Sequence, residues 1–250
     1  MRLGSVTVAA CTVRAVGFWY AQAMNSSIAH NLVQVQTQIQ AACLAAGRPA
    51  GSVQLLAVSK TWGPDAVRAA HAAGQTAFGE NYIQEAVDKI QALQDLPLQW
   101  HCIGPIQSNK TRLVAEHFGW VHSIDRLKIA QRLSEQRPAH LPPLQVCIQV
   151  NVDGGETKSG VSPQELPALA QAVAALPRLQ LRGLMTIPEP AETEAQMRAV
   201  HRQAKGLFDR LLTQGLPLDT LSMGMSADMS AAIAEGSTMV RVGTAIFGKR

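Results

Sequence analysis

Aromatic residues are scarce in this chain, which limits what its surface can recognise. They make up 4% of the 250 residues, as five Phe, four Trp and two Tyr. A platform on which successive nucleic-acid bases stack needs more of them. The net charge is only +4, and the basic residues are scattered along the chain. Both features argue against nucleic acid as a partner.

Cysteine motifs and long apolar runs are also missing. The four cysteines include no Cys-x-x-Cys pair, and the histidines show no metal spacing such as His-Glu-x-x-His, so we expect no bound metal. Cys102 and Cys147 lie in apolar runs, where cysteine usually serves as a small buried hydrophobe. That usage is typical of a reducing cytoplasm. No apolar run reaches membrane-spanning length, so we expect a cytoplasmic protein without a membrane partner.

The composition is that of a folded globular protein, with 47% apolar and 16% charged residues. The first residues are set apart from the rest. Met1-Arg2 and the Val/Ala-rich stretch after it loosely resemble a signal peptide, but Arg14 interrupts the apolar part. We therefore interpret residues 1–23 as an N-terminal extension, either disordered or upstream of the true start, and residues 24–250 as a single domain.

Strand-like and helix-like segments alternate along that domain. After an opening helix from Ser27, apolar runs of strand length alternate with segments whose apolar residues recur every three or four positions. Pro64 and Gly74 bracket one such helix. The expected strands cover residues 53–60, 76–81, 98–104, 120–125, 144–151, 181–187, 220–225 and 239–247.

Eight strands, each but the last followed by a helix, predict a single (β/α)8 barrel of the TIM type. The length of 250 residues is typical of that fold. A doubly wound open sheet is the alternative. It would normally have fewer strands, and no Gly-x-Gly-x-x-Gly follows the first strand. The opening helix is expected to plug or flank the bottom of the barrel.

Functional groups of such barrels lie at the carboxyl ends of the strands. Lys60 closes the first strand on the pleat face of Leu56 and Val58, so we expect it to point into the barrel mouth. It is either a strand-end lysine that reaches solvent or an amine whose pKa is lowered by burial, ready to form an imine. Asn81 ends the second strand. His101 on the third strand faces the same mouth or is an ordinary core histidine.

The last two strands carry the materials of an anion site. Ser226 follows the seventh strand, and Gly243 and Thr244 supply backbone N–H groups and a hydroxyl in the eighth segment. The loops after strands seven and eight are a frequent phosphate site in this fold. Each residue alone is more often a turn or a cap, but together they predict phosphate binding. Arg241 interrupts the apolar eighth strand, and it needs an anion or hydrogen-bond acceptor there.

These groups fit one ligand, pyridoxal 5′-phosphate. It has an aldehyde for Lys60, a phosphate for the anion site and a ring nitrogen for Arg241. An arginine donates to that nitrogen and keeps it unprotonated, so the ring is a weaker electron sink and transaminase-like chemistry is disfavoured. A sugar-phosphate aldolase could use the same lysine and phosphate site, but it would leave Arg241 without a role.

Seven stretches of the chain resemble the pyridoxal phosphate homeostasis protein family, in order and over residues 27–250. They are Leu56-Ala-Val-Ser-Lys-Thr61, Phe78-Gly-Glu-Asn-Tyr82, Trp100-His-Cys-Ile-Gly-Pro-Ile-Gln-Ser-Asn-Lys110, Lys158-Ser-Gly160, Arg182-Gly-Leu-Met185, Leu221-Ser-Met-Gly-Met-Ser226 and Met239-Val-Arg-Val-Gly-Thr-Ala-Ile-Phe-Gly248.

The resemblance implies a fold like the N-terminal domain of bacterial alanine racemase, with the cofactor bound as an internal aldimine. It also implies roles for particular residues. Lys60 forms the aldimine, Asn81 lies beside the ring, Arg241 meets the ring nitrogen, and Ser226, Gly243 and Thr244 hold the phosphate.

Two functions remain open. The first is a carrier that keeps pyridoxal phosphate in check and hands it to apo-enzymes, with no catalytic residue of its own. The second is an amino-acid racemase of the alanine racemase type. Such racemases add a C-terminal β domain, and a partner subunit supplies a tyrosine as the second base. Only Tyr20 and Tyr82 occur here, so a second base is not obvious and a monomeric carrier is favoured.

Overall fold

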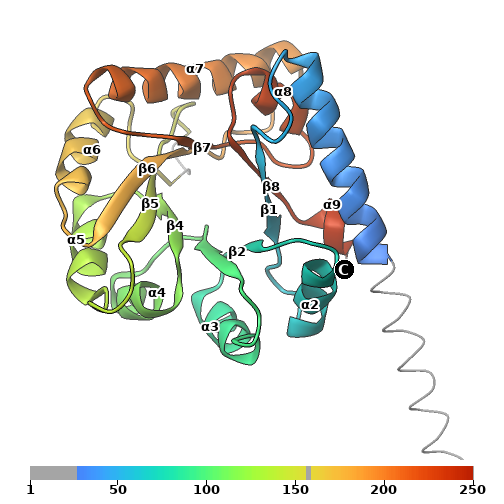
Figure 1. Ribbon diagram of the computed structural model, residues 1–250. Helices are drawn as coiled ribbons and strands as arrows, with labels where there is room; N and C mark the ends of the chain where they lie inside the picture. Colours follow the sequence, from blue (N-terminus) through green and yellow to red (C-terminus); the bar gives the residue numbers. More distant parts are fainter. Residues whose placement is uncertain (1–26, 156–158, 250) are drawn as a thin grey trace, which may run out of the picture.

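The computed structural model describes residues 27–155 and 159–249. The predicted extension, residues 1–23, lies outside the described residues. Among the described residues, eight parallel strands form one closed barrel in sequence order, and the last strand pairs with the first (Figure 1). The strands are β1 (Gln54–Val58), β2 (Ala77–Glu80), β3 (Gln99–Cys102), β4 (Trp120–Ile124), β5 (Leu144–Gln149), β6 (Leu179–Met185), β7 (Thr220–Ser222) and β8 (Met239–Val242).

Helices alternate with the strands and surround the barrel, which confirms the (β/α)8 prediction and excludes the open sheet. Each connection crosses from one strand to its parallel neighbour, the arrangement expected when strands are joined by helices. The helices are α2 (Pro64–Ala72), α3 (Ile83–Ala92), α4 (Thr111–His117), α5 (Leu127–Gln136), α6 (Leu166–Ala174), α7 (Glu194–Thr213), α8 (Met229–Ala234) and α9 (Thr244–Phe247).

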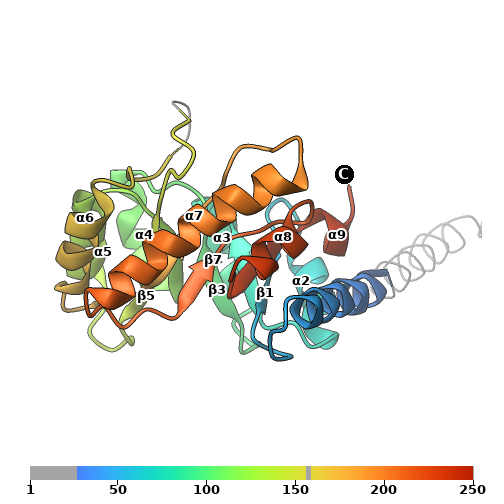
Figure 2. The same ribbon diagram turned by 90° about the horizontal axis from the view of Figure 1, so that it is seen from above.

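The opening helix, described over residues 27–45, lies on the outside of the barrel next to α8, α9 and α2 (Figures 1 and 2). Asn31 Nδ2 donates to the carbonyl of Ile246, 2.9 Å away, and Arg48 donates to the carbonyls of Ile233 and Ser237. The helix therefore takes the place of a long helix after β8, and it flanks the barrel instead of plugging it. Its buried face consists of Ile28, Leu32, Val35, Ile39 and Cys43, as the spacing predicts.

The end of β8 differs from the sequence prediction. The strand was expected to continue to Phe247, but it ends at Val242 and α9 follows. The amides of Ile246 and Phe247 donate back to the carbonyl of Gly243, at 2.9 and 3.0 Å, and this closes a helical turn. Phe247 stacks on Trp62 with ring centroids 5.9 Å apart. This tertiary contact explains why β-branched and aromatic residues adopt a helix here.

The barrel interior is apolar on one side and polar on the other. Leu56, Ala77, Ile103 and Met239 form a small apolar cluster from β1, β2, β8 and the residue after β3. Polar side chains cross the remaining interior: His101, His122, Ser222 and Arg241, all at most 4% exposed. Burial of polar side chains is costly unless they form hydrogen bonds. Their concentration in this half of the barrel therefore points to a functional site.

Candidate functional site

A pocket of about 370 Å³ opens at the carboxyl ends of β1 and β8. Three of the six predicted site residues line it: Lys60, Gly243 and Thr244. Trp62 and Lys249 also contribute to its wall, and the sequence reasoning did not name either. The closed barrel brings these segments together because β1 pairs with β8. A nucleophilic amine therefore shares one cavity with Gly243 and Thr244, two of the three residues of the predicted anion site.

Lys60 lies two residues after the end of β1, and its side chain is exposed. The burial considered for it at the sequence level is therefore wrong, because the strand ends at Val58 and Lys60 stands in the turn that follows. The next residue, Thr61, has φ 66°, and it is the one non-glycine residue with positive φ in the described ranges. Such a conformation costs about 1–3 kcal/mol and is found at functional sites. The Thr61 amide donates to Glu85 Oε1 over 2.7 Å, which holds this turn.

A buried ion pair lies behind the lysine. Lys89 Nζ of α3 donates to Glu80 Oε1 at 2.6 Å and to the carbonyl of Ser59 at 2.9 Å. Ser59 Oγ donates to the same Glu80 oxygen at 2.6 Å. Burial raises the pKa of Glu80, and the Lys89 ammonium opposes that shift. The network joins β1, β2 and α3 directly before Lys60 and Asn81. Glu80 and Lys89 were not identified as a buried ion pair from the sequence.

Asn81 is half-buried at the end of β2. Its Oδ1 atom is buried and has no hydrogen-bond partner among the described residues. A Cβ placed on Gly104 would lie 2.2 Å from the Asn81 carbonyl oxygen, so glycine permits the chain after β3 to pack closely against Asn81. The structure thus leaves a buried amide oxygen that a donor group from a ligand could satisfy.

Arg241 is buried, at 4% exposure, inside the barrel below the mouth. Its Nη1 donates to the carbonyl and to Oγ of Ser222, at 2.7 and 2.9 Å, and its Nη2 donates to the carbonyl of Thr186 at 2.8 Å. Burial lowers the pKa of Arg241 to about 10, so the guanidinium is still charged at neutral pH. In the described chain these bonds use three of its five N–H groups. The remaining donors are available to a ligand.

The partners of Arg241 were missed at the sequence level. Ser222 lies on β7 and Thr186 follows β6, and only the barrel register reveals that both face the arginine. His122 of β4 reaches across the interior, and its Nδ1 lies 3.0 Å from Ser222 Oγ. Its Nε2 lies 2.9 Å from Nδ1 of His101. His101 is therefore a hydrogen-bonded core residue, which was one of its two sequence interpretations.

Backbone geometry supports an anion site beside Lys60. The Arg241 amide donates to the carbonyl of Gly224 at 3.0 Å, toward β7. Because amides alternate along a strand, the Gly243 amide faces the same side, toward the loop that carries Ser226. The amides of Gly243 and Thr244 have no hydrogen-bond partner in the described part of the chain. Ser226 itself is exposed and does not line the pocket with Lys60.

The loop after β7 is tied down by Asp228. Its Oδ1 accepts from the amide of Met225 at 2.6 Å, and its Oδ2 lies 2.9 Å from Nε2 of His201 in α7. These bonds lower the pKa of Asp228, although burial acts in the opposite direction. The carboxylate therefore fixes the loop on both sides of Ser226.

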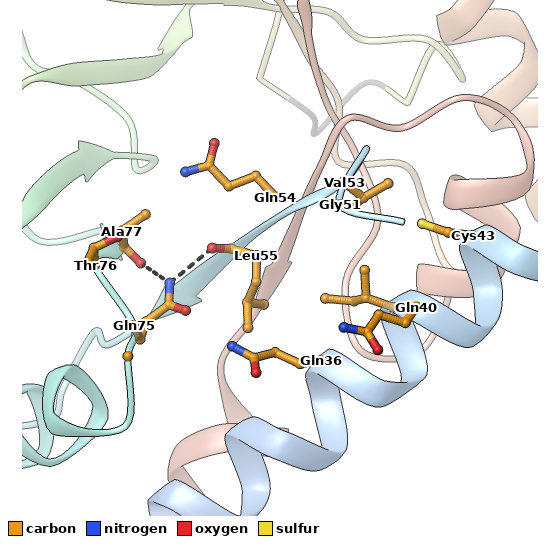
Figure 3. A pocket seen from close by; sticks show the side chains of 12 residues that line it. Gln36, Gln40, Cys43, Gly51, Val53, Gln54, Leu55, Gln75, Thr76 and Ala77 are labelled. Atoms are coloured by element: carbon orange, nitrogen blue, oxygen red, sulfur yellow. Dashed lines mark hydrogen bonds between the residues drawn. The ribbon is translucent and has the colours of Figure 1, made fainter. Parts of the chain in front are cut away.

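A second pocket, of about 230 Å³, lies at the other end of the first strands, between β1, β2 and the helix of residues 27–45 (Figure 3). Gln36 and Gln40 face it from the helix. Gln75 spans the gap between the strands, because its Nε2 donates to the carbonyls of Leu55 and Ala77 at 3.0 and 2.7 Å. None of the predicted site residues lines this pocket. It is separate from the candidate site.

Comparison with known proteins places the chain in a family. Residues 26–250 match the family model described as alanine racemase, N-terminal domain. The chain is 63% identical over 225 residues to the pyridoxal phosphate homeostasis protein of Pseudomonas aeruginosa, which covers 90% of this chain and 96% of that relative. The chain belongs to the pyridoxal phosphate homeostasis protein family. This confirms the resemblance inferred from its motifs.

Solved structures agree with that membership. PipY of Synechococcus elongatus, solved with PLP bound, is 41% identical to this family member, with a TM-score of 0.78 over 88% of this chain and 100% of that one. An alanine racemase from Corynebacterium glutamicum has a TM-score of 0.64 at 24% identity, and the match covers 90% of this chain but 61% of the racemase. The second likeness shows a common fold.

No helix in the described ranges of this family member is long and apolar enough to cross a membrane.

Proposed function

We propose that the protein binds pyridoxal 5′-phosphate at the mouth of the barrel and serves its homeostasis as a carrier. The observation that carries this proposal is the pocket that Lys60 lines together with Gly243 and Thr244. The buried guanidinium of Arg241 belongs to β8, the strand that ends directly before Gly243. Membership of the family and the PLP-bound structure of PipY support it.

The residues present fit the chemical groups of this cofactor. The amine of Lys60 would hold the cofactor by covalent attachment to its aldehyde, which supplies an electrophilic carbon. The free amides of Gly243 and Thr244, with the hydroxyl of Ser226, supply donors for the phosphate. The partnerless oxygen of Asn81 supplies one acceptor at the end of β2, the strand next to β1. Of the six residues selected from the sequence, Lys60, Gly243 and Thr244 line the pocket, and Asn81, Ser226 and Arg241 lie outside its lining.

Arg241 limits the chemistry that the site supports. Its guanidinium is charged at neutral pH and donates only to neutral oxygens of Ser222 and Thr186. Toward a ring nitrogen it can donate a hydrogen bond but cannot deliver a proton as a carboxylic acid would. The bound cofactor would remain a weak electron sink, which favours holding and release over the stabilisation of carbanions.

The proposal also covers the recipients of the cofactor, the oligomeric state and the cellular location. The exposed position of Lys60 leaves the covalent bond open to exchange with another amine, so apo-enzymes that need the cofactor are the proposed recipients. We propose that residues 24–250 act as one domain, as a monomer and in the cytoplasm.

Exchange of the α-hydrogen of an amino acid distinguishes a racemase from a carrier. The cofactor-loaded protein is incubated with L-alanine in deuterated water, and product chirality and deuterium content are measured. The carrier proposal predicts no inversion and no α-deuterium at an enzyme-like rate, together with restored activity when an apo-aminotransferase is added. Rapid inversion with deuterium incorporation would overturn it. A matched sample of Lys60→Ala controls for reaction with free cofactor.

A further inference from the structure

A continuous line of hydrogen bonds crosses the interior of the barrel below the candidate site. It runs from Arg241 Nη1 to Ser222 Oγ (2.9 Å), from Ser222 Oγ to His122 Nδ1 (3.0 Å), and from His122 Nε2 to His101 Nδ1 (2.9 Å). β4 and β7 are not neighbours in the barrel, so the contact between His122 and Ser222 spans the interior. The four side chains are between 0% and 4% exposed.

The direction of donation along this line follows from Arg241. A guanidinium only donates, so Ser222 Oγ accepts from it and can use its own proton for one further bond. His122 Nδ1 lies at that position. If it accepts, the proton of His122 is on Nε2 and is donated to His101 Nδ1. The proton of His101 is then on its Nε2, a buried atom without a hydrogen-bond partner among the described residues. In the reverse arrangement His101 Nε2 would carry no proton, and the hydroxyl proton of Ser222 would have no acceptor among the described side chains.

Both histidines are uncharged in this arrangement. Burial lowers the pKa of His101 to about 3 and moves the pKa of His122 well below its usual value, where His101 and Arg241 add to the effect. Trp120 of β4 stacks on the His101 ring, with centroids 5.1 Å apart. The guanidinium carbon of Arg182 of β6 lies over the Trp120 ring, 5.1 Å from its centroid.

The remaining titratable groups on this side of the interior do not alter that picture. Arg182 is paired with Asp219 and donates to Gln145 at 2.7 Å, so its charge is balanced at the barrel floor. Burial raises the pKa of Cys147 on β5 well above its usual value, so its thiol is neutral. Arg241 is thus the one unbalanced charge along the hydrogen-bonded line in the described chain.

We propose that His122 is a positioning residue for Arg241: it accepts the proton of Ser222, while His101 fixes its tautomer. With Ser222 held in this way, Nη1 of Arg241 donates both of its hydrogen bonds to Ser222 in the barrel interior. The unused N–H groups of Arg241 are directed to the ligand. The inference rests on the proposed function, in which Arg241 donates to the ring nitrogen of the cofactor. It adds a specific role for two histidines that touch no ligand.

The tautomers can be measured without any cofactor. Histidine labelled with ¹⁵N in the cofactor-free protein reports which ring nitrogen carries the proton. We expect both His101 and His122 as neutral rings with the proton on Nε2 between pH 5 and 8. A proton on Nδ1 of His122, or titration of that ring within this range, would overturn the proposal. His140, an exposed histidine, provides the reference signal of a ring in contact with solvent.

Two amide substitutions separate positioning from simple core packing. In His122→Asn the amide group can replace Nδ1 and still accept from Ser222, whereas in His122→Gln it reaches the position of Nε2 and leaves Ser222 without an acceptor. We expect the parent and His122→Asn to bind pyridoxal phosphate with the same absorption spectrum and release rate. His122→Gln should shift the spectrum and release the cofactor about fivefold faster, the factor equivalent to one hydrogen bond.

Val146→Ala is the stability control, because Val146 is fully buried on β5 and takes no part in the line. It should lose stability without a change in spectrum or release rate. If His122→Gln and Val146→Ala showed the same absorption spectrum and release rate, the positioning role would be refuted and the proposed function would stand. Absence of cofactor binding by the parent protein would instead refute the proposed function, and the tautomer measurement would still test the hydrogen-bonded line.

Discussion

Arg241 carries a positive charge into the barrel interior, where neutral oxygens are its hydrogen-bond partners. Desolvation of such a charge is costly unless its donors are used. The sequence shows that this arginine needs an acceptor, because it interrupts an apolar strand. It does not show which acceptor, since Ser222 and Thr186 are distant in sequence and become neighbours only through the strand register. The residue was predictable and its partners were not.

Replacement of Arg241 by lysine tests the importance of this geometry. Lysine keeps the charge but cannot reach both Ser222 and Thr186 with a planar fork. We expect Arg241→Lys to lower the free energy of unfolding by about 3 kcal/mol through lost charged hydrogen bonds. It should still form the covalent bond at Lys60, with a shifted absorption spectrum. Chemical denaturation and spectroscopy of the loaded protein measure the two effects, and an unchanged spectrum would contradict the placement of the ring.

The buried histidines predict a loss of stability in acid. The pKa of His101 is about 3 in the folded protein, against about 6.5 in an unfolded chain. Between these values the unfolded state binds the extra proton, so stability falls as the pH falls, by about 1.4 kcal/mol per pH unit. Urea unfolding of the parent at pH 7 and pH 5 should therefore show a loss about 2 kcal/mol larger than in His101→Asn. Equal losses in both proteins would contradict a neutral buried His101.

At the scale of elements, periodicity was a good guide to which segments are helices and strands. The face of the helix over residues 27–45 and the order of the strands were both predicted correctly. The end of β8 was not predicted correctly. α9 is held there by packing of Phe247 on Trp62, a contact between residues that are far apart in the sequence. The exposure of Lys60 was one of two alternatives from the sequence, and the structure decides between them because β1 ends two residues before it.

Two glycines separate close packing from helix propensity. Gly104→Ala would place a Cβ 2.2 Å from the Asn81 carbonyl oxygen, so we expect a loss of about 1–3 kcal/mol in the free energy of unfolding. Gly206 lies inside α7, and a Cβ there meets nothing within 4 Å. Gly206→Ala should therefore gain about 0.5–1 kcal/mol. Urea unfolding measures both, and a destabilised Gly206→Ala would show that the environment of α7 is wrongly described.

For the molecule as a whole, closure of the barrel creates the candidate site. Lys60 and Gly243 are far apart in sequence and share a pocket because β1 pairs with β8. The repeated strand–helix pattern predicts this closure, and with it the meeting of the lysine with the two residues after β8. The polar line of His101, His122 and Ser222 could not be predicted, since isolated histidines and serines in strands are most often ordinary core residues.

The central claim is that Lys60 holds pyridoxal phosphate covalently. The most direct test is to load the protein, reduce it with borohydride and locate the modified lysine by peptide mass spectrometry. We predict a single pyridoxyl-modified peptide that contains Lys60, and no modification in Lys60→Ala. Lys249 lines the same pocket and is the matched comparison, so Lys249→Ala should be labelled as the parent is. Label on Lys249 or another lysine, or a reducible cofactor that persists in Lys60→Ala, would contradict the account.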